Sequence, residues 1–375
     1  MNKKHKIIAI TAEEFSERRN KICQLLNKSN YDAIFIAGGT NLLYFTGING
    51  SYSDRISGLL LDNSGKIKYI CPKFEADRIK ELLPKNSNIF TWEEHESPAQ
   101  LLKKLLNSKI KKIVIDHDIP FWQLEVLQEA MPNITFCCGT QLINSCRAIK
   151  SPAELALIKA SNQITIEVFS EVFNNLKEGI KNTEVSTMTT ELFKTKNISG
   201  SAFILFGEAA AYPHGTKYPQ ILKKGEIVLI DGGCRIEGYF SDITRSVIFG
   251  EPTKRQLKIW KAVADAQLEV MKFAKSGVAC SKLDEIARKV IEKHGFGKGY
   301  ALFSHRLGHG IGLNGHEFPY LVQGNNLPLQ AGMTFSNEPG IYIAGEIGVR
   351  LEDCIYITET KAEFFTKPAK DIFSF

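Results

Sequence analysis

One strongly apolar hairpin of this chain carries two carboxylates. In GEIVLIDGGCRIEGYFSDITRSVIF, residues 225–249, Asp231 ends an apolar strand, and a second strand carries Asp242 after a turn near Glu237-Gly238. Such a hairpin places the two aspartates opposite, or nearly opposite, each other, where like charges repel and are poorly hydrated. No lysine or arginine of these two strands is placed to separate them, so a bound metal ion is the simplest source of positive charge.

A second hairpin repeats this arrangement near the C-terminal end of the chain. In MTFSNEPGIYIAGEIGVRLEDCIYI, residues 333–357, a turn near residues 344–346 predicts that Glu338 lies opposite Glu352. One such pair could equally be a set of salt-bridge partners. Two pairs on two apolar hairpins favour a metal centre, and such a centre requires the two hairpins to meet in the fold.

Three of the eight histidines lie between these hairpins, in SHRLGHGIGLNGHE, residues 304–317. His305 and His309 have the four-residue spacing of a zinc-binding helix, but each of the four glycines in the stretch would cost a helix about 1 kcal/mol. We therefore expect an extended segment in which His305 and His309 share one face. The glycines would leave the other face bare, so that something can approach closely. A turn at Asn314-Gly315 then precedes His316.

The charges of this set favour two ions. The four carboxylates of the two hairpins carry four negative charges, which two divalent cations neutralise, and one neutral imidazole adds a nitrogen ligand. An oxygen-rich set with one nitrogen suits Mn²⁺, Co²⁺, Fe²⁺ or Zn²⁺ better than a thiolate zinc site does. Two such ions activate water and stabilise a developing oxyanion. The sequence therefore predicts metal-assisted hydrolysis, with amide and phosphoester bonds as the candidate substrates.

The length of the chain predicts two domains, because 375 residues are long for one hydrophobic core. Residues 1–148 alternate helix and strand patterns, as an α/β domain does. A strong helix start follows, where Ser151 and Glu154 can form a capping box and Pro152 occupies the first helical position. We therefore expect the second domain to cover residues 149–375.

Composition narrows the function classes. The net charge of +6 comes largely from short lysine clusters, which are typical of a solvated face rather than a nucleic-acid surface. No GxGxxG or Walker sequence supports a nucleotide role. The eight cysteines form no CxxC and are interpreted as buried, reduced thiols. The N-terminal apolar run is too short for a signal peptide, and no run approaches a membrane span. We expect a cytoplasmic protein without nucleic-acid or membrane partners.

The order of the motifs resembles a known family. IDGG and SDITR are followed by HRLGHGIGLNGHE, SNEPG and GVRLED. This order resembles the M24 metallopeptidases of the creatinase and methionine aminopeptidase superfamily, and most closely the Xaa-Pro peptidases, prolidase and aminopeptidase P. NLLYFTGI resembles the N-terminal domain of that group. The resemblance implies an α+β fold, in which a "pita-bread" catalytic domain follows a smaller α/β creatinase-like domain. It also implies a homodimer, or a dimer of dimers, that acts on proline-containing peptides.

The resemblance also implies which residues hold the metals. Asp231 would chelate one ion, and Asp242 and Glu352 would bridge both ions. His309 and Glu338 would hold the other ion, and Glu338 would also act as the general base.

Further residues are implied on the substrate side. His214, in YPHGTK, matches a family histidine near the scissile bond. His316 matches one that contacts the substrate carbonyl or carboxylate, and His305 matches one that lines the pocket. Arg350, two residues before Glu352, would orient the carboxylates.

One position departs from the family pattern. HEFPY places Tyr320 where many prolidases have an arginine that grips the free carboxylate of a dipeptide. A phenol can donate one hydrogen bond to that group but cannot form a bidentate charged pair. Another cation, such as Arg306 or one from the N-terminal domain of a partner subunit, could do this work. Otherwise longer Xaa-Pro peptides could be accepted.

We predict an Xaa-Pro dipeptidase that uses two metal ions, with Mn²⁺ favoured. The alternative is an aminopeptidase P that releases the N-terminal residue of longer peptides. A non-catalytic binding protein on this fold would be expected to have lost metal ligands, but all five positions are filled here. A dinuclear phosphoesterase would be expected to show more histidine ligands and more basic groups. The glycines of residues 304–317 would keep that segment thin enough for a peptide to lie near the metals.

Overall fold

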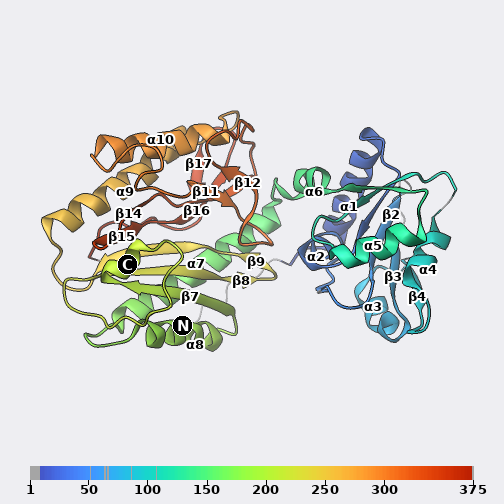
Figure 1. Ribbon diagram of the computed structural model, residues 1–375, viewed down its shortest axis with the longest axis horizontal. Helices are drawn as coiled ribbons and strands as arrows, with labels where there is room; N and C mark the ends of the chain where they lie inside the picture. Colours follow the sequence, from blue (N-terminus) through green and yellow to red (C-terminus); the bar gives the residue numbers. More distant parts are fainter. Residues whose placement is uncertain are drawn as a thin grey trace. The chain divides into compact units, whose positions relative to one another are not determined.

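A computed structural model describes residues 9–373 except residues 51, 63, 64, 66, 86 and 107. The chain folds into two compact units, one of residues 10–147 and one from Ala148 onward (Figure 1). Among the described helices, none is both long and apolar enough to span a membrane. All eight cysteines are free, and six of them are buried, as predicted. Cys137 and Cys138 depart from that prediction, because the first is half-buried and the second exposed.

The N-terminal unit is built on a six-stranded sheet in the order β4-β3-β2-β1-β5-β6. Its strands are β1 (Ala33–Ile36), β2 (Gly58–Asp62), β3 (Lys68–Pro72), β4 (Asn88–Trp92), β5 (Lys112–Ile115) and β6 (Thr135–Cys138). β2 runs antiparallel to both of its neighbours, and the other pairs are parallel. This mixed sheet with intervening helices is the α/β pattern that the sequence predicts.

Helices pack on the sheet of the N-terminal unit. They are α1 (Ala12–Lys28), α2 (Gly39–Thr46), α3 (Ala76–Leu82), α4 (Pro98–Leu105), α5 (Phe121–Ala130) and α6 (Thr140–Arg147), with a 3₁₀ turn at Lys73–Glu75. Leu102 of α4 and Leu127 of α5 share one buried cluster with Phe35 of β1. Because side chains alternate along a strand, Ile34 of β1 is buried on the opposite face.

The second unit contains two larger sheets and a short hairpin. One sheet has the order β10-β8-β7, with β9 paired to β8, and the other has the order β12-β11-β13-β16-β17. The first consists of β7 (Ser199–Phe206), β8 (Ile227–Ile236), β9 (Tyr239–Phe240) and β10 (Ile243–Ile248). The second consists of β11 (Gly308–Gly310), β12 (Glu317–Leu321), β13 (Thr334–Asn337), β16 (Asp353–Ile357) and β17 (Ala362–Phe364). The hairpin is β14 (Gly340–Ile343) with β15 (Ile347–Arg350).

Two pairs of helices cover these sheets from opposite sides (Figure 1). They are α7 (Pro152–Asn174) with α8 (Asn182–Thr195), and α9 (Lys254–Phe273) with α10 (Cys280–Lys293). A 3₁₀ turn, η2 (Gly207–Ala211), follows β7. The predicted start of α7 is confirmed, because Ser151 and Glu154 form both bonds of a capping box and a proline occupies the first turn.

The alternation of side chains along β8 determines which residues face the site. Val228 and Ile230 join the cluster beneath α7 and α8. Leu229 joins the cluster that contains α9 and α10. Asp231 lies two residues beyond Leu229 and therefore projects from the same face, towards the interior between the two helical layers.

Candidate metal centre

The first carboxylate pair lies on the β8–β10 hairpin. Thr244 is the direct cross-strand partner of Asp231, and the chain turns between Ile236 and Tyr239, where the sequence predicts a turn. Asp242 precedes Thr244 by two residues and so lies on the same face. The two aspartates are therefore nearly opposite each other, as the hairpin pattern predicts.

The second pair lies where β14–β15 continues into β13–β16. Gly340 pairs with Arg350 in the short hairpin, and Asn337 pairs with Asp353 in the larger sheet. The register is the same on both sides, so Glu338 lies across from Glu352, as predicted. Glu352 is only 2% exposed.

His309 is the middle residue of β11. Its imidazole Nε2 lies 3.2 Å from Oε1 of Glu338 and 3.7 Å from Oδ2 of Asp242. The predicted absence of a helix is confirmed here. The predicted long extended segment is wrong, because the strand covers only residues 308–310 and its pairing with β12 shifts register between His309 and Gly310.

The glycines around His309 serve a different purpose from the predicted one. A Cβ at Gly308 would lie 2.0 Å from the carbonyl oxygen of Ser336, and a Cβ at Gly310 would lie 2.6 Å from that of Glu317. The chain itself therefore makes the close approach, through the neighbouring strands β13 and β12. The expectation that these glycines make room for a peptide is corrected accordingly.

The five side chains fall into two overlapping groups of donors. Ligand atoms of Asp231, Asp242 and Glu352 lie within 4.8 Å of one another, and so do those of His309, Glu338 and Glu352. Glu352 belongs to both groups. Carboxylate oxygens with one imidazole nitrogen form a donor set that fits two divalent cations of the Mn²⁺, Co²⁺, Fe²⁺ or Zn²⁺ type.

The crowding of these groups shifts their titration in the metal-free protein. Burial and the neighbouring charge of Asp231 raise the pKa of Asp242 to about 8. Burial and the charges of Asp242 and Glu338 raise the pKa of Glu352 well above its usual range. Burial also opposes ionisation of Glu338, but the hydrogen bond and charge of His309 outweigh it and lower the pKa of Glu338 to about 2. The positively charged side chains of the cluster therefore do not neutralise all of its carboxylates.

Arg350 connects the two hairpins from behind the carboxylates. Its Nη2 donates to Oδ2 of Asp231, and its Nε donates to Oγ1 of Thr244 at 3.0 Å. Thr244 in turn donates to Oε2 of Glu352 at 2.6 Å. Arg350 thus contacts one carboxylate directly and another through a hydroxyl, a geometry that suits the orienting role expected for it.

Tyr342 joins Arg350 to His305. Nη1 of Arg350 donates to the Tyr342 hydroxyl at 2.8 Å, and that hydroxyl lies 2.8 Å from Nε2 of His305. A carbonyl oxygen can only accept, so Nδ1 of His305, 2.8 Å from the carbonyl oxygen of Arg306, carries the proton of the neutral ring, and the Tyr342 hydroxyl donates to Nε2. Burial lowers the pKa of His305, which favours this neutral form.

A cavity of about 730 Å³ opens over the carboxylates. His214, His305 and His316 all line it, as predicted. The ring of His316 stacks on that of His309 with centroids 3.6 Å apart, and its Nε2 lies 4.0 Å from Oδ2 of Asp242. The histidines thus surround the space above the donor groups.

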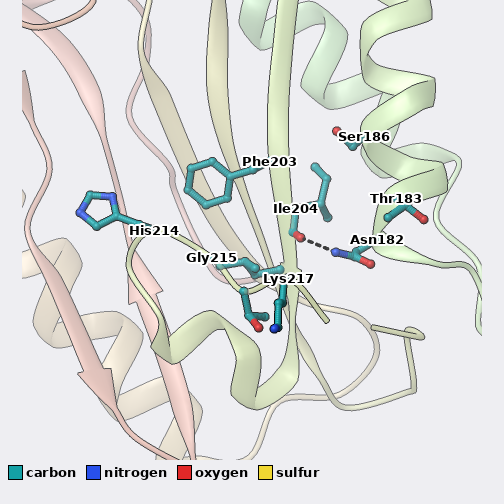
Figure 2. A pocket seen from close by; sticks show the side chains of 10 residues that line it. Asn182, Thr183, Ser186, Phe203, Ile204, His214, Gly215 and Lys217 are labelled. Carbon is teal, nitrogen blue, oxygen red and sulfur yellow. Dashed lines mark hydrogen bonds between the residues drawn. The ribbon is translucent and has the colours of Figure 1, made fainter. Parts of the chain in front are cut away.

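A smaller cavity of about 340 Å³ adjoins the first. Figure 2 shows Phe203 between His214 and the side chains of α8. Phe203, His214 and Ser186 line both cavities. Asn182 donates to the carbonyl oxygen of Ile204 at 3.1 Å and so fixes the start of α8 against β7.

Tyr320 lies beside the centre rather than above it. It is the direct cross-strand partner of His309 in the β11–β12 pairing. The guanidinium of Arg306 lies over its ring, 4.5 Å from the centroid. Among the described residues, those lining the larger cavity include Arg306 but not Tyr320.

Three residues that support the site were missed in the sequence. Thr244 and Ser336 each lie two residues from a carboxylate, on the same strand face, so the alternation of side chains could have identified them. Ser336 Oγ donates to Glu338 at 3.1 Å and accepts from the main-chain N–H of His309 at 3.0 Å. Tyr342 carries no such signal, because its role depends on the meeting of two separate segments.

Comparisons with known proteins agree with this geometry. Residues 156–359 match the model of metallopeptidase family M24, and residues 18–149 match the creatinase/prolidase N-terminal domain. The putative dipeptidase YkvY of Bacillus subtilis (strain 168) is 33% identical over 365 residues, which cover 95% of this chain and 99% of the relative.

Solved structures show the same arrangement over nearly the whole chain. An Xaa-Pro dipeptidase from Bacillus anthracis matches with a TM-score of 0.87 at 26% identity, covering 96% of this chain and all of the other. An X-Pro aminopeptidase from Thermotoga maritima MSB8 matches with a TM-score of 0.81 at 27% identity, covering 92% of this chain and 98% of the other. The expected fold class is therefore confirmed: an α+β catalytic domain preceded by a creatinase-type domain.

Proposed function

This chain belongs to metallopeptidase family M24, and we propose that it hydrolyses the Xaa-Pro bond of dipeptides with the help of two divalent metal ions. One observation carries the proposal. Two groups of metal-binding side chains share Glu352, and all five expected ligands are present in them. A carboxylate that belongs to both groups can hold two cations side by side, as a two-metal site requires.

Each ligand has a proposed place in the centre. Asp231 would hold one ion, His309 and Glu338 would hold the other, and Asp242 and Glu352 would be shared by both. The ions would polarise the scissile carbonyl and lower the pKa of the attacking water. Mn²⁺ is the proposed native ion, because it suits a set of four carboxylates and one imidazole.

Glu338 is the proposed general base. The hydrogen bond from Ser336 at 3.1 Å holds its carboxylate in place, and its lowered pKa keeps it ionised at neutral pH. An ionised carboxylate beside the reacting atoms can accept the proton of the attacking water and later pass it to the leaving proline nitrogen. Arg350, through Asp231 and Thr244, keeps the remaining carboxylates aligned.

The histidines around the cavity are the proposed substrate contacts. His214 and His316 lie on the cavity wall, where they can donate to the oxygen atoms of a bound peptide. His305 is held by Tyr342 with a fixed tautomer and lines the same wall. Homodimer formation and a cytoplasmic location are part of the proposal.

Aminopeptidase P activity is the second candidate. Phe203 and His214 line both the main cavity and the adjoining cavity of about 340 Å³. The adjoining cavity offers space for peptide residues beyond a dipeptide. The likeness to an X-Pro aminopeptidase supports the same alternative. Dipeptidase activity is preferred because Arg306 lines the main cavity and its guanidinium can pair with a free carboxylate.

The two candidates are separated by a pair of substrates. Protein treated with EDTA and reloaded with Mn²⁺ or Co²⁺ should cleave Ala-Pro, and removal of the metal should stop the reaction. Ala-Pro and Ala-Pro-Ala, compared on one preparation, distinguish a dipeptidase from an aminopeptidase. Glu338→Gln provides the inactive control of matched size. Hydrolysis of Ala-Ala without hydrolysis of Ala-Pro would contradict the proline assignment.

A further inference from the structure

We propose that Arg306, supported by the ring of Tyr320, binds the free α-carboxylate of a dipeptide substrate and thereby selects dipeptides over longer peptides. The inference rests on the proposed Xaa-Pro activity and adds a specificity residue to it. The contact to the substrate carboxylate would then come from the segment that precedes His309, and not from the residue at position 320.

The position of Arg306 relative to the metal centre follows from three contacts. Its carbonyl oxygen accepts from Nδ1 of His305 at 2.8 Å, which ties its backbone to the wall of the cavity. Its guanidinium lies 4.5 Å from the ring centroid of Tyr320. Tyr320 in turn is the cross-strand partner of His309, and side chains of such partners stand only about 5 Å apart at Cβ.

The two arginines that line the cavity differ in whether their guanidinium groups already have partners. Arg350 is already engaged, because each of its three guanidinium nitrogens donates, to Asp231, Thr244, Tyr342 and a main-chain carbonyl. Arg306 is exposed, and within the described part of the chain no carboxylate pairs with it. It is therefore the guanidinium of this cavity that can form a bidentate pair with an incoming carboxylate.

Tyr320 then has a supporting role. A guanidinium that lies over an aromatic ring is attracted to its face, and the N–H groups at the edge of the guanidinium can still bind a planar anion. The ring, rather than the hydroxyl, is the part of Tyr320 that holds Arg306 in this way. Tyr320 thus contributes by positioning Arg306. By itself, its phenol could donate only one hydrogen bond to the carboxylate.

The test compares two substrates that differ only in the carboxylate. Ala-Pro and Ala-Pro-amide share the scissile bond, but the amide has no negative charge at its end. Arg306→Ala should lower kcat/KM for Ala-Pro about 10- to 100-fold, the range for loss of a charged hydrogen-bonded pair, mainly through KM. Activity on the amide should change little, because the amide does not use the guanidinium.

Three further variants sharpen the result. Arg306→Lys should fall between wild type and Arg306→Ala, because an ammonium keeps the charge but loses the fork. Tyr320→Leu removes the ring and should lower kcat/KM for Ala-Pro about two- to fivefold, and Tyr320→Phe, which keeps the ring, should lose less than Tyr320→Leu. Arg255→Ala, which removes an exposed arginine paired with Glu346, is the matched control for charge.

The outcomes distinguish failure of the Arg306 assignment from failure of the proposed Xaa-Pro activity. Equal losses on Ala-Pro and its amide in Arg306→Ala, or no loss on either, would overturn the assignment of Arg306 while leaving the Xaa-Pro activity intact. If wild-type, metal-loaded protein cleaves neither substrate, the proposed function fails and the inference fails with it.

Discussion

Thr244 and Glu352 join the two carboxylate-bearing hairpins through three hydrogen bonds. Their main chains pair in both directions, at 3.3 and 3.1 Å, and Oγ1 of Thr244 donates to Oε2 of Glu352 at 2.6 Å. The carboxylate that both donor groups share is therefore fixed by a residue of the other hairpin. This contact converts two separate strand pairs into one centre.

Replacement of Thr244 by valine should weaken metal binding. Valine keeps the shape of the buried side chain but removes the hydroxyl, which donates to Glu352 and accepts a hydrogen bond from Nε of Arg350. Loss of a contact to a metal ligand typically costs 10- to 100-fold in metal affinity, and we expect a loss of about 10-fold or more for Mn²⁺. Calorimetric titration measures it. Thr244→Ser is the control and should retain wild-type affinity; an equal loss in both variants would contradict the role of the hydroxyl.

Tyr342→Phe should reduce both stability and catalysis. The change leaves Nη1 of Arg350 without its 2.8 Å hydroxyl partner and releases Nε2 of His305. A buried donor that loses its acceptor costs about 1–3 kcal/mol, which urea denaturation can measure. The pH profile of kcat should change as well, because Nε2 of neutral His305 loses the hydrogen bond from Tyr342 that favours the neutral ring. An unchanged profile would leave Tyr342 with a purely structural role.

Metal binding should release protons and strengthen as the pH rises. In the metal-free protein burial and the charge of Asp231 raise the pKa of Asp242 from 3.8 to about 8, so the folded protein holds a proton there at pH 6. This proton stabilises the metal-free fold most at low pH, and the contribution is lost as the pH rises through 8. A metal must displace the proton, so its stabilising effect should grow from pH 6 to pH 8.

Thermal unfolding at pH 6 and pH 8, with and without Mn²⁺, measures this change. Titration calorimetry in two buffers with different ionisation enthalpies counts the protons released. A shift in unfolding temperature that is the same at both pH values would show that Asp242 is already ionised without metal.

Gly308→Ala should destabilise the catalytic unit. The new Cβ would lie 2.0 Å from the carbonyl oxygen of Ser336, which belongs to the neighbouring strand and cannot move away freely. Overpacking of this kind costs roughly 1–3 kcal/mol. Gly315→Ala in the same segment is the control, since its Cβ would meet nothing closer than 3.8 Å. Equal stability of the two variants in urea denaturation would contradict the close-approach explanation for Gly308.

The two carboxylate pairs could be predicted from the sequence because each pairing depends on local rules. The turn after Ile236 and the turn near Gly345 set the registers, and alternation then determines which carboxylates face each other. The capping box at Ser151 was readable for the same reason: its hydrogen bonds span only three residues.

Other features could not be predicted, because they depend on contacts between distant segments. The register shift after His309 follows from pairing with β12, so the long extended segment expected there was wrong. The sequence indicates that the glycines of that segment are sites of close approach. It does not indicate which part of the molecule approaches them. The position of Arg306 over the ring of Tyr320 and the bridge formed by Tyr342 likewise appear only when the strands are assembled.

The most direct test of the account is the rate of Ala-Pro hydrolysis measured against added Mn²⁺, starting from metal-free protein of known concentration. Two overlapping donor groups that share Glu352 predict no activity at the start and a plateau once two equivalents per chain are bound. Activity that is independent of added metal, or an absence of Ala-Pro hydrolysis with two equivalents bound, would contradict the two-metal Xaa-Pro peptidase.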